Sequence, residues 1–269
     1  MNKKHIRHFQ SWFNDYVSHF YSKGQDQEND WAIKLKEEHS WKVREEILHI
    51  SNKLQLSEDD IVIAEILGLF HDIGRFHQYK KHRTFRDDLS ENHAKIGARI
   101  VEHSQILDNL NADEKTVILN GILYHNVHTL PGDLDTRCLF FCKLLRDADK
   151  LDIWRVVINY YYKEQGENPH TILELGLPDG PRYSTRVLND LYNGKTSNAS
   201  DIKNLNDFKL LQIGWVYGIN FYPTLQEIKK RNYIEMIAST LPETQELKKV
   251  IRHVNNYLTL KVMKASKVK

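Results

Sequence analysis

The chain has 269 residues, of which 41% are hydrophobic, and a formal net charge of +2. This length suits one large hydrophobic core, or one core with an added part, and a charge so near zero gives no general attraction to nucleic acid or to anionic lipid. We therefore expect neither a stable nucleic-acid complex nor a membrane protein, because no apolar run approaches the roughly 20 residues of a membrane span.

Two features of the sequence indicate a reducing compartment. The two cysteines, Cys138 and Cys142, lie four residues apart on a predicted helix. They are expected to be reduced core residues, because two thiols alone make a poor zinc site. No secretory signal is visible after Met1, so we expect a cytoplasmic protein.

Hydrophobic residues recur with the period of an α-helix through most of the chain, and neither alternating strands nor an internal repeat is evident. This pattern predicts an all-α fold. Residues 5–22 form the first predicted helix, whose aromatic face should pack in the core, and the polar residues 23–29 form a loop. Further helices are predicted over residues 30–54, 58–72, 91–104, 112–126 and 134–163.

The predicted helix 58–72 is apolar almost all round and ends in the adjacent residues His71 and Asp72. Ser57 is expected to cap its first turn, and Gly74 is expected to let the chain leave its last turn. Burying an imidazole and a carboxylate together is costly, and a bound cation would offset much of that cost.

Further residues of the metal-ligating types recur at the buried faces or the ends of other predicted helices. His39 lies on the apolar face of the second predicted helix, and His93 falls in the first turn of the helix that Ser90 should cap. His125 ends the next predicted helix, and Asp149 lies on the long helix after it. Five segments would thus bring four imidazoles and two carboxylates to one point.

The character of the sequence changes after residue 164. Glycine, proline and polar residues predict a long irregular segment over residues 165–200, of the kind that often covers a site. Helices are expected again over residues 201–219, 224–240 and 243–262, with a capping residue at Thr224. We therefore expect a helical core over residues 1–164 and, over residues 165–269, a loop and C-terminal helices that pack on the same core.

The candidate ligands stand in short motifs between about residues 30 and 160. These motifs are Glu38-His39-Ser40, His71-Asp72, Asn92-His93-Ala94-Lys95-Ile96-Gly97, Tyr124-His125-Asn126 and Asp147-Ala148-Asp149-Lys150-Leu151-Asp152. In this order they resemble the HD-domain superfamily of metal-dependent phosphohydrolases, and the third and fourth motifs mark its dinuclear branch. The resemblance implies an HD-domain helical bundle with an additional C-terminal helical part.

The resemblance also implies a metal site with two divalent transition metals per chain. One metal would be held by His39, His71, Asp72 and Asp149, and the second by His93 and His125, with Asp72 bridging. Nitrogen-rich ligands suit iron, manganese, cobalt, nickel or zinc better than magnesium or calcium. The sequence chooses neither among these metals nor between one bound ion and two.

The charged residues 75–90 are predicted to be an irregular segment, which is either a solvated loop or a basic rim that holds phosphate. Arg75 either holds phosphate or braces an acidic residue such as Asp152, and Lys150 either touches phosphate or is a surface lysine. The candidate catalytic residues are Asp72, Arg75 and Lys150. The candidate substrate-binding residues are Arg75, Arg83, Arg86 and His128.

The leading hypothesis for the function is hydrolysis of a phosphate ester or anhydride of a nucleotide or another small phosphorylated metabolite, through a hydroxide that the metals activate. Two alternatives stay open: an HD-type di-iron oxygenase, whose ligand order is similar, and a non-catalytic module that senses a nucleotide. No GYP sequence for cyclic dinucleotides follows His125, and no glycine-rich phosphate-binding loop is present. The sequence indicates neither the substrate nor the oligomeric state.

Overall fold

The computed structural model describes residues 3–163 and 171–266. Throughout these residues it contains helices and no strand, so the predicted all-α fold is confirmed. The chain divides into two compact units, Met1–Asp152 and Ile153–Lys269, and the boundary falls inside the long helix α7 (Thr136–Lys163). The division that we predicted at residue 164 lies outside the described residues.

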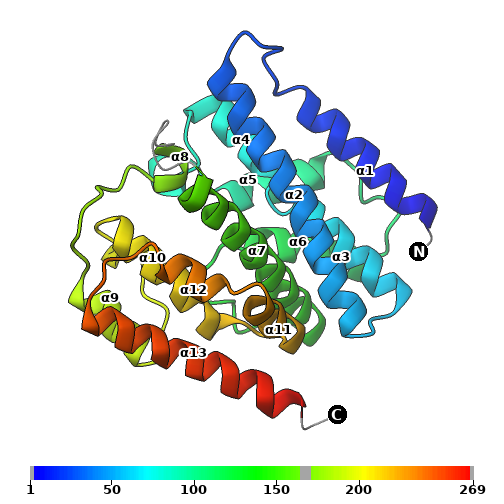
Figure 1. Cartoon of the computed structure of the whole chain (residues 1–269). Helices are drawn as coiled ribbons and strands as arrows, with labels where there is room; N and C mark the ends of the chain where they lie inside the picture. The colour runs from blue at the N-terminus through cyan, green and yellow to red at the C-terminus, as the bar shows by residue number, and fades with distance from the viewer. Residues whose placement is uncertain (1–2, 164–170, 267–269) are drawn as a thin grey trace. The chain divides into compact units, whose positions relative to one another are not determined.

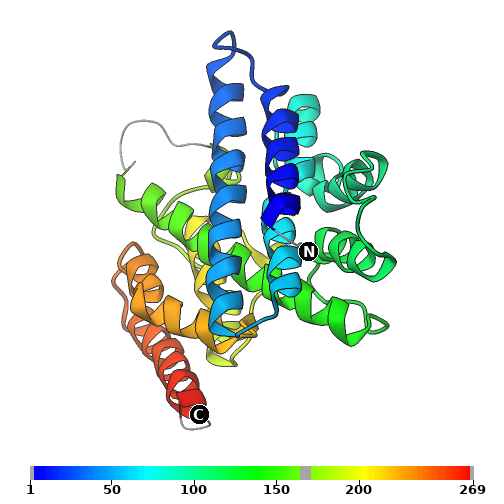
Figure 2. The ribbon, with the colours of Figure 1, turned by 90° about the vertical axis from the view of Figure 1, so that its right-hand side faces the viewer.

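The first unit contains six complete α-helices in its described part, and α7 as far as Asp152. These helices are α1 (Lys3–Ser18), α2 (Gln27–Lys53), α3 (Glu58–Phe70), α4 (Ile73–His82), α5 (His93–His103) and α6 (Ala112–Tyr124), with a short 3-10 helix, η1 (Asp87–Leu89), between α4 and α5. Figures 1 and 2 show α1 and α2 running alongside each other, with α3 beside both.

Helix α3 is the centre of this unit, as its apolar sequence predicts. Every residue from Ile63 to Phe70 is buried, and α3 packs against α1, α2 and α6. The ring of Phe70 contacts aromatic rings of α1, which explains the aromatic face of that helix. Ser57 caps α3 as predicted, because its hydroxyl accepts a hydrogen bond from the amide of Asp60.

The structure corrects the prediction for residues 71–90 in two ways. The helix predicted over 58–72 ends at Phe70, and His71 and Asp72 form a turn before a second helix, α4. Helix α4 occupies part of the segment that we predicted to be irregular. Its buried side chains include Phe76 and Tyr79, whose spacing of three residues fits a helix but was obscured by the surrounding charges.

Two predicted roles of small residues near this turn were wrong. Gly74 does not end a helix but lies inside α4, where a side chain would overlap the carbonyl oxygen of His93 and lie 2.7 Å from the amide nitrogen of Gly97. Its lack of a side chain therefore allows α4 and α5 to approach each other closely. The residue that caps α5 is Asn92, not Ser90, because the side chain of Asn92 accepts from the amide of Lys95.

The second unit is built from shorter helices that follow the end of α7. They are α8 (Thr171–Glu174), α9 (Thr185–Tyr192), α10 (Leu205–Gly214), α11 (Tyr222–Lys230), α12 (Tyr233–Ala238) and α13 (Gln245–Ser266), with 3-10 helices η2 (Ala199–Asp201) and η3 (Trp215–Gly218). Helix α10 packs against α9 and α12, and α13 packs against α9, α11 and α12.

Three predictions for this unit need correction. The described part of the segment 165–200 is not wholly irregular, because it contains α8, α9 and η2. The helix predicted over 224–240 is broken at Asn232, which adopts a left-handed backbone with a φ of 57°. Thr224 does not cap a helix but lies buried inside α11, which begins after Phe221.

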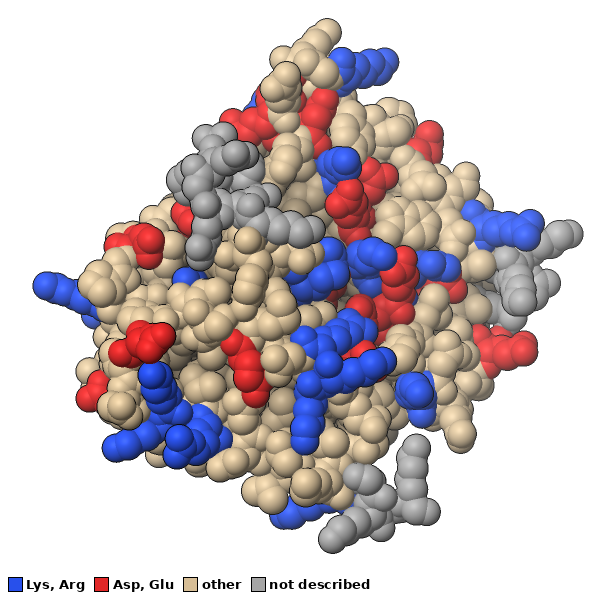
Figure 3. Space-filling view, in the orientation of Figure 1, with Lys and Arg blue, Asp and Glu red and all other residues tan. Residues whose placement is uncertain are grey.

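No helix among residues 3–163 and 171–266 has the length and apolar character needed to cross a membrane. On the face drawn in Figure 3, basic and acidic side chains are interspersed, in keeping with the net charge of +2.

The close approach of α4 and α5 leads to a test of stability. We expect Gly74→Ala to lower the free energy of unfolding by about 1–3 kcal/mol or more, because the new methyl group would meet main-chain atoms that cannot rotate away. The measurement is urea denaturation. The matched control is Gly132→Ala, since a side chain at Gly132 would meet no atom within 4 Å. Equal stability of the two variants would contradict this account of Gly74.

Candidate metal centre

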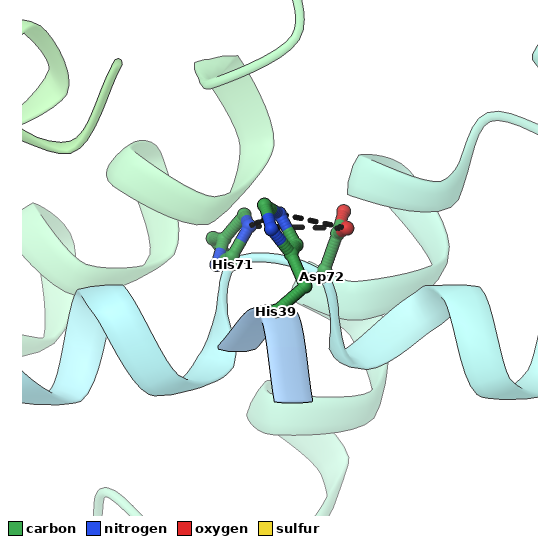
Figure 4. Close-up of side chains that lie close together, drawn as sticks. All are labelled: His39, His71 and Asp72. Carbon is green, nitrogen blue, oxygen red and sulfur yellow. Dashed lines mark hydrogen bonds and ion pairs between the residues drawn. The ribbon is translucent and has the colours of Figure 1, made fainter. Parts of the chain in front are cut away.

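The structure brings together all six residues that the sequence analysis selected as metal ligands. They come from five places in the first unit: α2 carries His39, the turn between α3 and α4 carries His71 and Asp72, α5 begins at His93, His125 follows α6, and α7 carries Asp149. The four imidazoles and Asp72 are buried, whereas the side chain of Asp149 is 16% exposed. Figure 4 shows His39 reaching from α2 to the turn that carries His71 and Asp72.

The first group of ligand atoms surrounds the imidazoles of His39 and His71. Their Nε2 atoms are 3.2 Å apart. Oδ1 of Asp149 lies 3.1 Å from Nε2 of His39 and 3.6 Å from Nε2 of His71. Oδ2 of Asp72 lies 3.7 Å and 3.8 Å from the same two nitrogens. Two nitrogens and two carboxylate oxygens thus face one point.

The second group repeats this arrangement with the imidazoles of His93 and His125, whose Nε2 atoms are 3.0 Å apart. The other carboxylate oxygen of Asp72, Oδ1, lies 3.2 Å from Nε2 of His93 and 3.6 Å from Nε2 of His125. Asp72 therefore presents one oxygen to each pair of imidazoles. In each group, ligand atoms of the two imidazoles and of Asp72 lie within 4.8 Å of one another.

Hydrogen bonds on the far side of two rings fix which nitrogen carries the proton. Nδ1 of His71 is 2.9 Å from the carbonyl oxygen of Gly68, and Nδ1 of His125 is 2.7 Å from that of Ile122. A carbonyl oxygen only accepts, so each Nδ1 must donate, and a neutral ring then keeps a lone pair on Nε2. Both rings therefore point a lone pair into the cluster.

Carboxylates hold the other two rings in the same way. Nδ1 of His39 is 2.7 Å from Asp152, and Nδ1 of His93 is 2.8 Å from both oxygens of Asp87. A carboxylate or carbonyl behind the remote nitrogen is the usual setting of a histidine that binds a metal. Nitrogen lone pairs this close repel each other unless a proton or a metal ion lies between them, and each pair of nitrogens also faces an oxygen of Asp72. The residues present therefore fit divalent metal ions.

Two basic side chains beside Asp72 offset part of the negative charge of the cluster. Nζ of Lys36 lies 2.8 Å from Oδ2 of Asp72, and Nε of Arg75 lies 3.5 Å from Oδ1. Burial by itself would raise the pKa of Asp72, but Lys36, His71 and Arg75 hold this pKa well below its usual range. Asp72 is therefore ionised at neutral pH and able to bind cations.

The two carboxylate-backed histidines differ in their pKa. Burial lowers the pKa of His39, but hydrogen bonds to Asp149 and Asp152 outweigh burial and raise the pKa to about 9. Burial and the neighbouring Arg75 lower the pKa of His93. Without a bound cation, His39 therefore holds a second proton at neutral pH, and His93 does not.

Sequence analysis missed two residues of this centre, Asp87 and Lys36. Asp87 accepts hydrogen bonds from Arg75 at 3.1 Å, Gln78 at 2.8 Å and Asn126 at 3.0 Å, besides that from His93. No sequence signal pointed to Asp87, because the adjacent Asp88 is the same residue type and the sequence does not show which of the two faces the core. Lys36 precedes His39 by one helical turn, and this spacing was a usable signal.

The predicted catalytic and substrate-binding residues lie in different settings. Arg75 is beside the cluster and pairs with Asp87, whereas Asp152, the partner that we had considered, contacts His39. Arg83 pairs with Asp26, Arg86 pairs with Asp88, and the carbonyl oxygen of His128 accepts from Arg146. Nζ of Lys150 donates to the carbonyl oxygen of Arg146, and burial lowers its pKa. Their roles in binding and catalysis stay predictions.

Comparison with protein families agrees with this geometry. A family model described as the HD domain matches residues 37–154. This segment is an HD domain. The resemblance that the motifs indicated is thereby confirmed, and all six candidate ligands lie within the matched HD domain. HD domains bind divalent metals, and most are metal-dependent hydrolases. No curated protein and no solved structure matched the chain.

The contact between Asp87 and His93 leads to a test of metal content. We expect Asp87→Asn to weaken binding of the second metal by about 10- to 100-fold, because the ring of His93 loses the carboxylate that orients it. Metal content, measured by elemental analysis after dialysis, should fall below that of the unmodified protein.

The control is Asp88→Asn, which changes the adjacent, exposed carboxylate that pairs with Arg86. It should leave metal content unchanged. If the Asp87 variant binds two metals as tightly as the unmodified protein, Asp87 does not support the second position.

The raised pKa of His39 leads to a test of pH dependence. A metal that binds Nε2 must displace the second proton of His39, so affinity should rise as the pH increases from 7 toward 9, by about tenfold per pH unit. Titration with Mn²⁺ in buffers of different ionisation enthalpy would measure the released proton. Affinity that is constant over this range would show that His39 carries no second proton.

Proposed function

We propose that this protein is a metal-dependent phosphohydrolase that cleaves a phosphate ester or anhydride of a nucleotide or another small phosphorylated metabolite. The observation that carries this proposal is the placement of Asp72, whose two oxygens each face a pair of imidazole nitrogens. A single bridging carboxylate between two nitrogen-rich positions suits a pair of divalent ions in one site.

The proposed cofactor is two divalent transition metal ions per chain. The first would be held by His39, His71, Asp72 and Asp149, and the second by Asp72, His93 and His125. When bound, such a pair supplies Lewis acidity toward a phosphoryl oxygen and lowers the pKa of water.

The protein's own residues give this chemistry its orientation. Asp152 and Asp87 keep a proton on Nδ1 of His39 and His93, so that each Nε2 faces the cluster. The five mostly buried ligands limit access of water, and the partly exposed Asp149 marks the open side of the cluster. A substrate phosphate would approach from that side.

A covalent route through a cysteine is disfavoured. Both cysteines are free and buried in the first unit, as the sequence predicts. Burial raises the pKa of Cys142 to about 12, and burial also raises that of Cys138. Neither thiol is ionised at neutral pH, and the thiolate is the nucleophilic form. Hydrolysis by activated water needs neither of them.

The proposal is tested by reconstituting the metal-free protein separately with iron, manganese, cobalt, nickel and zinc. Each form is assayed for phosphate release from nucleotides, sugar phosphates and other small phosphates. We expect turnover with at least one metal and its loss, by 100-fold or more, in His39→Ala, because that variant removes a ligand of the first position.

Two outcomes would overturn the proposal. Oxygen consumption by the iron form, without phosphate release from any compound, would indicate an oxygenase. Tight nucleotide binding without turnover, in protein shown to contain two metals per chain, would indicate a sensing module.

A further inference from the structure

Lys36 lies in the metal centre, although no sequence motif pointed to it. It precedes His39 by three residues on α2, and residues three apart lie on the same face of a helix. Its Nζ is 2.8 Å from Oδ2 of Asp72, the oxygen that faces the imidazoles of His39 and His71. Its side chain is 18% exposed, more than that of Asp72 at 4%.

The ammonium group of Lys36 has few charged or aromatic partners. In the described part of the chain, the carboxylate paired with its ammonium group is that of Asp72. Nζ also lies 5.3 Å from the centroid of the ring of Phe85. An aromatic ring attracts a cation but does not neutralise its charge.

Arg75 is bound much more firmly. Its Nη1 donates to the side chains of Gln78 and Asp87 and to the carbonyl oxygen of Phe85. These acceptors belong to the same part of the chain and keep the guanidinium in place. Lys36, with one ionic partner on a flexible stem, is the basic group beside the cluster that can change its partner.

Charge balance shows when that change is favourable. Two divalent ions would carry four positive charges, which the carboxylates of Asp72, Asp149, Asp87 and Asp152 would balance. Lys36 and Arg75 would then leave two positive charges in excess. Both oxygens of Asp72 would be drawn toward the metals, so the ammonium group of Lys36 would lose much of its attraction to Asp72 and would lie beside a positive centre. An anion at this place would satisfy both the metals and Lys36.

We propose that Lys36 binds the phosphoryl group of the substrate. Its ammonium group pairs with Asp72 in the metal-free protein and moves to a phosphoryl oxygen in the metal-loaded protein. The excess of positive charge favours a terminal phosphate, which carries two negative charges, over a phosphodiester, which carries one. The substrate class is therefore a phosphomonoester or a nucleotide with a terminal phosphate. This inference rests on the proposed function for its metals, but it concerns binding rather than turnover.

The two other arginines that the sequence analysis selected are occupied elsewhere. Arg83 pairs with Asp26 at 2.6 Å, and Arg86 pairs with Asp88 at 2.6 Å, and neither carboxylate belongs to the cluster. Lys36 is thus a better candidate for the phosphate ligand than either arginine.

The test measures binding of inorganic phosphate to the manganese-loaded protein by calorimetry, with dimethyl phosphate as the singly charged comparison. We expect Lys36→Met to keep two metals per chain but to bind phosphate about 10- to 100-fold more weakly, because a charge-assisted hydrogen bond is lost. Lys36→Arg should stay within a few-fold of the unmodified protein, since it keeps the charge. Dimethyl phosphate should bind more weakly than phosphate to the unmodified protein.

The matched control is Lys34→Met, which removes an exposed lysine of α2 that pairs with Glu38 on the surface. It should change neither metal content nor phosphate binding. The proposal is overturned if the fully loaded Lys36→Met protein binds phosphate as tightly as the unmodified protein. It is also overturned if Lys36→Met and Lys36→Arg both lose metal, because Lys36 would then serve to position Asp72.

The two proposals can fail separately. If the loaded protein binds phosphate through Lys36 but hydrolyses no phosphate compound, the proposed function fails and the role of Lys36 stands. If the protein hydrolyses a substrate and Lys36→Met leaves both KM and phosphate binding unchanged, the role of Lys36 fails and the proposed function stands.

Discussion

The carboxylate of Asp72 lies between two pairs of imidazole nitrogens. The two nitrogens are 3.2 Å apart in one pair and 3.0 Å apart in the other. Nitrogen lone pairs at such distances repel one another unless a proton or a metal ion lies between them, and the ionised carboxylate of Asp72 attracts such a cation. Asp72 can serve both pairs because it lies in a turn between two helices, α3 and α4, where helices from several directions can reach it. The buried α3 fixes one side of this turn, and the close approach of α4 to α5 at Gly74 fixes the other.

Charge is arranged in layers around this carboxylate. The candidate ligands are four imidazoles and two acids, and behind two of the imidazoles lie Asp87 and Asp152. Lys36 and Arg75 flank Asp72 and offset part of this negative charge. Asp87 also contacts both Arg75 and His93. One carboxylate therefore orients a basic side chain and a candidate metal ligand. Metal binding and anion binding are therefore expected to influence each other.

Much of the centre could be predicted because each candidate ligand ends or lines an apolar helix, and the helical period shows which residues face the core. The supporting contacts could not be predicted. Some join residues that are distant in the sequence, and others depend on which way a side chain points: Asp87 faces His93, whereas the adjacent Asp88 faces Arg86. Helix α4 was missed since its charged surface residues masked a short buried face. Gly74 was misread because a glycine that permits close packing looks, in sequence, like a glycine that ends a helix.

The hydrogen bonds behind the four imidazoles are of two kinds, and this difference affects how the centre can change in evolution. His71 and His125 donate to main-chain carbonyl groups three residues earlier, at Gly68 and Ile122. No substitution at those two positions removes a carbonyl oxygen, so the orientation of these rings persists as long as the helix end persists. The rings of His39 and His93 depend on side chains that a single codon change can delete. Each pair of imidazoles thus contains one ring whose support withstands substitution and one ring whose support a substitution can remove. In related sequences, the supporting carboxylates should therefore be lost before the supporting carbonyl groups.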